Sequence, residues 1–176
     1  IDLFRLRNRI ATEIWNDFAT KPYYASKEPK AKSGVTGKVV EVILNNEYRG
    51  IYSLTEAMDR KELKLKKYDD ENQKFHGQLW KVSSWDKATF WDIDKDYDNT
   101  QETWHAFETK YPDIEDVNPT DYSPLYEAID FVVNSNDETF KEEVGDYFDI
   151  SVLIDYQLFQ ETLKPVDNNG KNMYWG

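Results

Sequence analysis

The chain has 176 residues, which is enough for one domain with a real hydrophobic core, or for one domain and a small part of another. Aromatic residues make up 15% of the sequence and argue against intrinsic disorder, although 32% of the residues are charged. The formal net charge of −12 argues against nonspecific binding to nucleic acid or to an anionic membrane, and the lack of cysteine excludes disulfide and thiolate chemistry.

The first predicted element is an amphipathic helix over residues 3–18, which Asp2 would cap. Its apolar face holds four residues at helical spacing: Leu3, Leu6, Ile10 and Ile14. Residues 20–38 contain prolines and glycines and predict a loop.

Residues 38–54 predict a β-hairpin that forms an antiparallel sheet with the first helix packed on it. Two runs rich in β-branched and apolar residues, 38–44 and 48–54, flank a turn at Asn45-Asn46-Glu47. A run of charged residues, 61–71, follows and predicts a solvated segment.

The middle of the chain carries less information about function. Acidic residues alternate over 92–98, but the glycine and the glutamate that an EF-hand loop requires are missing, so a solvated acidic loop is predicted. His76 and His105 lie far apart, which does not favour a zinc site or a Ser-His-Asp arrangement. Residues 123–148 predict two helical stretches.

The last predicted helix spans residues 149–163, with Asp149 or Ser151 as its N-cap and Pro165 beyond its end. Its apolar face comprises Val152, Tyr156, Phe159 and Leu163, widened by Leu153 and Ile154. Asp167 and Asn172 follow, five positions apart. This is the layout of a protein kinase catalytic loop, although this segment alone favours an amphipathic core helix followed by a polar turn.

Four segments together resemble the CotH (spore coat protein H) kinase family. They occur in the order of the family and span most of the chain: FRLRNRIATEI with Leu6-Arg7-Asn8, VEVILNNEYRGIYSLTEAMDR, GQLWK, and DYFDISVLIDYQLFQETLKPVDNNGKNMYWG. The resemblance implies an α+β, protein-kinase-like fold of two lobes, with an antiparallel N-lobe sheet and a mainly helical C-lobe.

On this resemblance, residues 1–176 form one CotH-kinase-like domain. Residues 1–58 would be the N-lobe part and the hinge, and residues 59–176 an insert and the C-lobe part. A kinase site also needs a lysine strand before the first helix and a second metal-binding aspartate after the catalytic loop. Neither is found, so the chain is expected to be a fragment that is incomplete at both ends.

The resemblance also implies site residues. Asp167 would be the catalytic base or the group that orients the hydroxyl, Lys171 would neutralise developing phosphate charge, and Asn172 would bind the metal. Glu56 and Met58 would lie in the hinge that meets adenine, and Lys81 would reach phosphate.

Several of these residues have plainer explanations. Glu56 could be a strand-end carboxylate, and Lys81 a strand lysine whose stem covers apolar surface. Glu13 could pair with a phosphate-binding lysine, but a solvated helix glutamate is the stronger interpretation. The implied cofactors are ATP with Mg²⁺ or Mn²⁺.

The function implied for the complete protein is phosphoryl transfer from ATP to a protein Ser or Thr hydroxyl. A non-catalytic surface or coat-assembly scaffold, acting as a pseudokinase, adhesion or carbohydrate-associated module, is the alternative, and an unrelated acidic α+β domain is a third. The expected partner is a protein substrate or a coat or surface protein, with no nucleic acid and no membrane insertion by this chain. The family resemblance implies a bacterial protein that is secreted, at the cell surface or in the spore coat.

Overall fold

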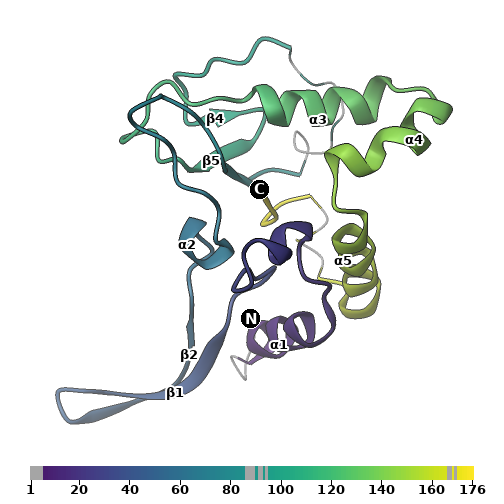
Figure 1. The fold of residues 1–176 in the computed structure, drawn as a ribbon. Helices are drawn as coiled ribbons and strands as arrows, with labels where there is room; N and C mark the ends of the chain where they lie inside the picture. The colour runs from purple at the N-terminus through teal and green to yellow at the C-terminus, as the bar shows by residue number, and fades with distance from the viewer. Residues whose placement is uncertain (1–5, 86–89, 91–92, 94, 166–167, 169) are drawn as a thin grey trace.

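A computed structural model describes residues 6–85, 90, 93, 95–165, 168 and 170–176 (Figure 1). Its elements, in chain order, are α1 (Arg7–Phe18), the 3-10 helix η1 (Tyr23–Ser26), β1 (Gly37–Leu44), β2 (Glu47–Thr55), α2 (Arg60–Leu63), β3 (Leu79–Val82), β4 (Thr103–Trp104), β5 (Phe107–Tyr111), α3 (Ser123–Asn134), α4 (Asp137–Tyr147), α5 (Ile150–Leu163) and β6 (Tyr174–Trp175). The strands pair antiparallel throughout. The predicted α+β class with antiparallel sheets is therefore confirmed.

The core lies between a four-stranded sheet, with strand order β4-β5-β3-β6, and helix α3. Leu125 and Ile129 are four residues apart on α3 and face the sheet, whose strands contribute Trp80, Val82 and Phe107. Burial of side chains of this size stabilises the fold by roughly 1.5–3 kcal/mol each. Tyr122 joins this core, and its hydroxyl accepts a hydrogen bond from Thr109 Oγ1 (2.9 Å).

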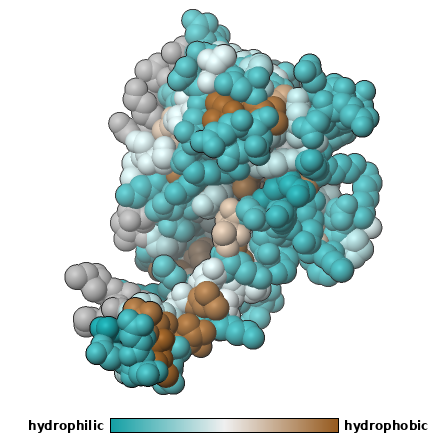
Figure 2. Space-filling model, turned by 90° about the vertical axis from the view of Figure 1, so that its left-hand side faces the viewer, coloured by the Kyte–Doolittle hydropathy of each residue, from teal (hydrophilic) through white to brown (hydrophobic). Residues whose placement is uncertain are grey.

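The predicted hairpin is confirmed as β1 and β2, which form a separate two-stranded sheet. Asn45 and Asn46 have φ of 51° and 60°, as a two-residue type I′ turn requires. The hairpin projects from the body (Figure 1) and leaves many apolar side chains exposed: Val39, Ile43, Leu44, Tyr48, Ile51, Tyr52 and Leu54. Figure 2 shows hydrophobic surface, in brown, at the lower end of the molecule.

The prediction for the first helix is wrong in two respects. Helix α1 begins at Arg7, and Leu6 precedes it as an N-cap without a side-chain hydrogen bond. The predicted apolar face is not the buried one, because Ile10 is 53% exposed whereas Arg9 is only 4% exposed. Asp2 and Leu3 lie outside the described residues.

Helix α1 is oriented by an aromatic contact rather than by its aliphatic residues. Trp15 packs edge-on against Tyr156 and Phe159 of α5, and its indole nitrogen donates to Ser33 O (2.9 Å). A tryptophan buries more area than an isoleucine and also supplies a hydrogen bond, so this contact holds α1 against α5. The predicted packing on the hairpin is limited to its base, where Arg9 lies against Gly37.

The last helix is confirmed as α5, and its N-cap is Asp149, whose carboxylate accepts from Val152 N (3.2 Å). The predicted widening of its apolar face is wrong, because Leu153 and Ile154 are exposed. The buried residue of α5 is instead Gln160. Residues 123–148 form α3 and α4, and no helix among the described residues has the length and apolarity of a membrane span.

Candidate functional site

The segment that follows α5 is held from two sides. On one side, Tyr156 Oη and Gln160 Nε2 of α5 both donate to Asn168 O, at 2.6 Å and 3.1 Å. On the other side, Asn172 N donates to Val82 O and Val82 N donates to Met173 O, both at 2.9 Å. The predicted catalytic loop is therefore tied to α5 near its start and to β3 at its end.

The groups that fasten this loop suit a permanent structural role. Burial raises the pKa of Tyr156 to about 12, so its hydroxyl stays a neutral donor over the physiological range. Helix α5 ends at Leu163, and its left-handed C-cap Lys164, with φ of 47°, turns the chain into the loop. Gly170 lies against Trp85, and a Cβ there would stand 2.6 Å from the indole ring. A larger residue at position 170 would displace the loop or the tryptophan.

The same pairing places Lys81 next to the loop. Strand β6 pairs antiparallel with β3, with Lys81 opposite Tyr174 and Trp80 opposite Trp175. Lys81 is partly buried, and Asn172 is exposed with φ of 59°, a left-handed conformation that asparagine tolerates well. Lys81 thus lies on β3, and Asn172, in the bend before β6, is bonded through its backbone to Val82, the next residue of the same strand.

The other loop residues are placed less completely. Lys171 is partly buried and already engaged in an interaction within the chain. Asp167 lies outside the described residues, so its predicted role stays a prediction. Glu13 is 63% exposed and pairs with Arg9 (Nε to Oε1, 3.3 Å), which gives it a partner other than a phosphate-binding lysine.

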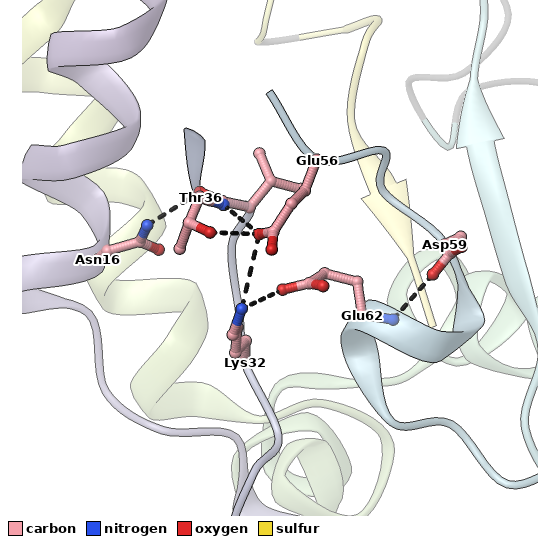
Figure 3. A network of polar contacts seen from close by, with 7 residues as sticks. Asn16, Lys32, Thr36, Glu56, Asp59 and Glu62 are labelled. Carbon is pink, nitrogen blue, oxygen red and sulfur yellow. Dashed lines mark hydrogen bonds and ion pairs between the residues drawn. The ribbon is translucent and has the colours of Figure 1, made fainter. Parts of the chain in front are cut away.

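The predicted hinge begins with a glutamate that is turned back toward the hairpin (Figure 3). The Glu56 carboxylate accepts from Thr36 N (2.8 Å) and from the Thr36 hydroxyl, and Lys32 Nζ lies 3.5 Å away. The hydrogen bonds from the Thr36 hydroxyl and amide hold the pKa of Glu56 at about 2. Glu56 N also donates to Thr36 O (2.9 Å).

These contacts give Glu56 a structural use at the base of the hairpin, which is the plainer of its two interpretations. Met58 follows and is partly buried. Among the described residues, no hydrogen bond or ion pair links Glu56 or Met58 with Lys81 or Asn172. The structure therefore places the backbone of Asn172 against β3, one residue along the strand from Lys81, and leaves the adenine-binding role of the hinge a prediction.

The residues that support the loop were missed by sequence reasoning. Tyr156 was assigned only to the apolar face of the helix, and Gln160 and Trp85 were not singled out. The sequence carried no signal that separates the buried Gln160 from Gln157, which lies in the same helix and is exposed.

The described residues do not form a complete binding site for a divalent cation, so a bound cation would also need ligands from a nucleotide or from water. Within the described ranges, no group of three or more His, Asp or Glu side chains is gathered as a metal cage. Mg²⁺ bound together with a nucleotide needs only one or two protein ligands, because phosphate oxygens and water fill the remaining positions. Asn172, exposed at the end of the loop, fits such a partial set of ligands.

Comparison with protein families identifies one model, described as CotH kinase protein, that matches residues 1–176. The match covers the whole chain, so it includes the hairpin, the strand with Lys81 and the loop with Asn172. No curated protein and no solved structure matches the chain.

Proposed function

The chain belongs to the CotH kinase protein family, and on this premise we propose that it transfers the γ-phosphoryl group of ATP to a Ser or Thr hydroxyl of a protein. The observation that carries this proposal is the anchoring of the loop between α5 and β3, next to Lys81. Phosphoryl transfer depends mainly on positioning and on charge stabilisation, so a loop tied at both ends suits it.

In the proposed reaction, the substrate hydroxyl oxygen forms a bond to the γ-phosphorus, and the bond from that phosphorus to the bridging oxygen of ADP breaks. Asp167 orients the hydroxyl and accepts its proton. Lys81 and Lys171 balance charge on the phosphate oxygens. Asn172 holds Mg²⁺ or Mn²⁺, which when bound neutralises phosphate charge.

We extend the proposal to the architecture and the location. The hairpin and α1 form one lobe, the segment from Glu56 to Asp59 is the hinge, and Met58 lies against adenine. The family is associated with the spore coat, so a coat or cell-surface protein is the substrate we favour.

The test uses protein expressed from the complete gene, with radiolabelled ATP and Mg²⁺ or Mn²⁺. Asp167→Asn is expected to remove nearly all phosphate incorporation and to leave the fold intact. The matched control is Asp116→Asn, which makes the same change at an exposed loop aspartate outside the site and is expected to keep full activity. Asn172→Ala is expected to raise the metal concentration needed for half-maximal rate more than it weakens nucleotide binding.

Two results would contradict the proposal. The catalytic assignment is wrong if Asp167→Asn transfers phosphate at the wild-type rate. If the wild-type protein neither binds ATP in a thermal-shift assay nor transfers phosphate, the non-catalytic scaffold becomes the better function.

A further inference from the structure

A basic pocket lies around α2 and the segment that follows it. It has a volume of about 330 Å³ and opens widely to solvent. Its lining comprises five cationic residues, one acidic residue and one leucine: Arg60, Lys61, Lys64, Lys66, Lys67, Glu28 and Leu65. With five positive charges and one negative charge (5 − 1 = +4), the pocket stands out on a chain whose net charge is −12.

The backbone explains why these cations share one surface. Helix α2 is a single turn, and Lys64 at its C-cap adopts a left-handed conformation with φ of 57° that reverses the chain. Leu65 N donates to Arg60 O (3.1 Å), so the lysines that follow return past the helix. Arg60 Nη1 donates to Leu65 O (3.0 Å), and its guanidinium lies 5.4 Å from the centre of the Tyr111 ring. These two contacts hold the Arg60 side chain in place at the side of the pocket.

The acidic side chains nearby neutralise little of this charge. Glu62 belongs to the same segment but forms its ion pair with Lys32 (Figure 3), and neither residue lines the pocket. Lys67 lies 3.3 Å from Asp70. Lys61, Lys64 and Lys66 are exposed, and within the described part of the chain none of them has an ion pair. Three lysine ammonium groups thus remain available to a ligand.

The form of the pocket indicates the kind of anion. A single small ion requires donors that converge on one point, whereas these lysines are spread along an open surface on flexible side chains. Several anionic groups along an extended chain match that distribution better. A long nucleic acid would also meet the acidic remainder of the molecule and be repelled. A short peptide with clustered negative charges would contact the basic pocket alone.

We propose that the basic pocket docks a peptide segment with clustered anionic side chains, either carboxylates or phosphoserines. Most residues that line the pocket come directly after Asp59 in the chain, and Asp59 is the end of the segment assigned to the hinge. Docking there would hold a protein substrate or partner on this chain. The interaction requires neither ATP nor Asp167, so it stands or falls independently of phosphoryl transfer.

Fluorescence anisotropy with labelled peptides tests the proposal on protein expressed from the complete gene. Three peptides share one Gly-Ser framework and differ only in the repeated residue, which is glutamate, phosphoserine or glutamine. Both anionic peptides, or one of them, should bind and the glutamine peptide should not; the tighter of the two identifies the preferred anion. Binding should weaken as salt is raised toward about 1 M, where charges interact only over roughly 3 Å.

Charge variants locate the interaction. Lys61→Gln with Lys66→Gln is expected to weaken anionic-peptide binding by about tenfold, equivalent to ~1.4 kcal/mol. The control is Lys38→Gln with Lys141→Gln, which makes the same change in net charge at exposed lysines of β1 and α4 and should change affinity less than about twofold. Far-ultraviolet circular dichroism confirms that both double variants fold.

Three outcomes would overturn the proposal. One is equal binding of the anionic and glutamine peptides. Another is an equal loss of affinity in the control variant, which would mean that overall charge, not the basic pocket, drives the association. The third is tighter binding of a single-stranded oligonucleotide of the same charge, which would make the surface a nucleic-acid site.

Discussion

The hairpin and the four-stranded sheet of this protein are built from similar residues but reach different degrees of burial. Leu79, Val82 and Phe107 of the larger sheet are completely buried, whereas Ile43 and Leu54 of the hairpin are 67% and 64% exposed. Both regions have regular antiparallel pairing. The difference is that α3 covers the larger sheet, and neither a third strand nor a covering helix lies along the hairpin among the described residues.

The comparison shows that strand pairing and strand burial have different requirements. Turn residues and β-branched side chains are sufficient to define the pairing of two strands. Burial requires a second layer, and a two-stranded hairpin is marginally stable on its own in water. Substitutions should therefore have large effects in the covered sheet and small ones along the hairpin, except at its base.

The largest effect is expected in the covered sheet. Phe107→Ala removes a completely buried ring between the sheet and α3 and should lower the free energy of unfolding by about 3–5 kcal/mol. Urea denaturation followed by tryptophan fluorescence measures it. A loss below ~1 kcal/mol would mean that this core is less tightly packed than its burial indicates.

The base of the hairpin should be the next most sensitive place. A Cβ at Gly37 would collide with the Arg9 guanidinium and with Leu54 O, so Gly37→Ala should destabilise the protein by about 1–3 kcal/mol.

The matched control is Gly145→Ala, because Gly145 lies in α4 with open space around it. Removing a helix glycine there should stabilise the protein by roughly 0.5–1 kcal/mol. If thermal melts show that both substitutions change stability in the same direction, the close contact at Gly37 does not determine the stability of the hairpin base.

A pH-dependent effect should also arise at the base. The pKa of Glu56 is about 2 in the folded protein and near 4.5 when unperturbed. A depressed carboxyl pKa stabilises the fold above the unfolded value, and this contribution is lost as pH falls from about 4.5 toward 2. Wild type should therefore lose stability in this window more steeply than Glu56→Gln, which has no charge to lose. Parallel pH curves for the two proteins in denaturant titrations would show that the contacts with Thr36 contribute nothing.

The smallest effect is expected at the tip of the hairpin. Ile43 is exposed and next to the bulge between Val42 and Ile43, so Ile43→Ser should change the unfolding free energy by less than about 0.5 kcal/mol. A loss comparable to that of Phe107→Ala would show that the hairpin is covered in solution.

Local patterns in the sequence predicted the elements well. The Asn45-Asn46 turn, the Asp149 cap and the spacing of Tyr156 and Phe159 each depend on neighbours within a few residues, and each prediction is confirmed. For the site, sequence placed Lys81 on a strand, and the structure adds that β6 pairs beside it.

What sequence could not predict depends on partners far along the chain. Arg9 is buried against Gly37 at the base of the hairpin, and Trp15 finds its neighbours in α5. Gln160 is buried because it donates to Asn168 of the loop. Helical periodicity ranks residues by their own hydropathy and carries no information about such partners.

The docking of α1 on α5 also has a consequence for how the protein is made. Thr20 N and Tyr23 N donate to Asp155 and Asp149, groups 135 and 126 residues further along the chain. On a ribosome that adds about 5–20 residues per second, the first helix leaves the exit tunnel several seconds before the aspartates that hold it exist. During this interval Trp15 has no α5 to pack against. The segment that contains α1 should therefore be open to chaperones until α5 emerges.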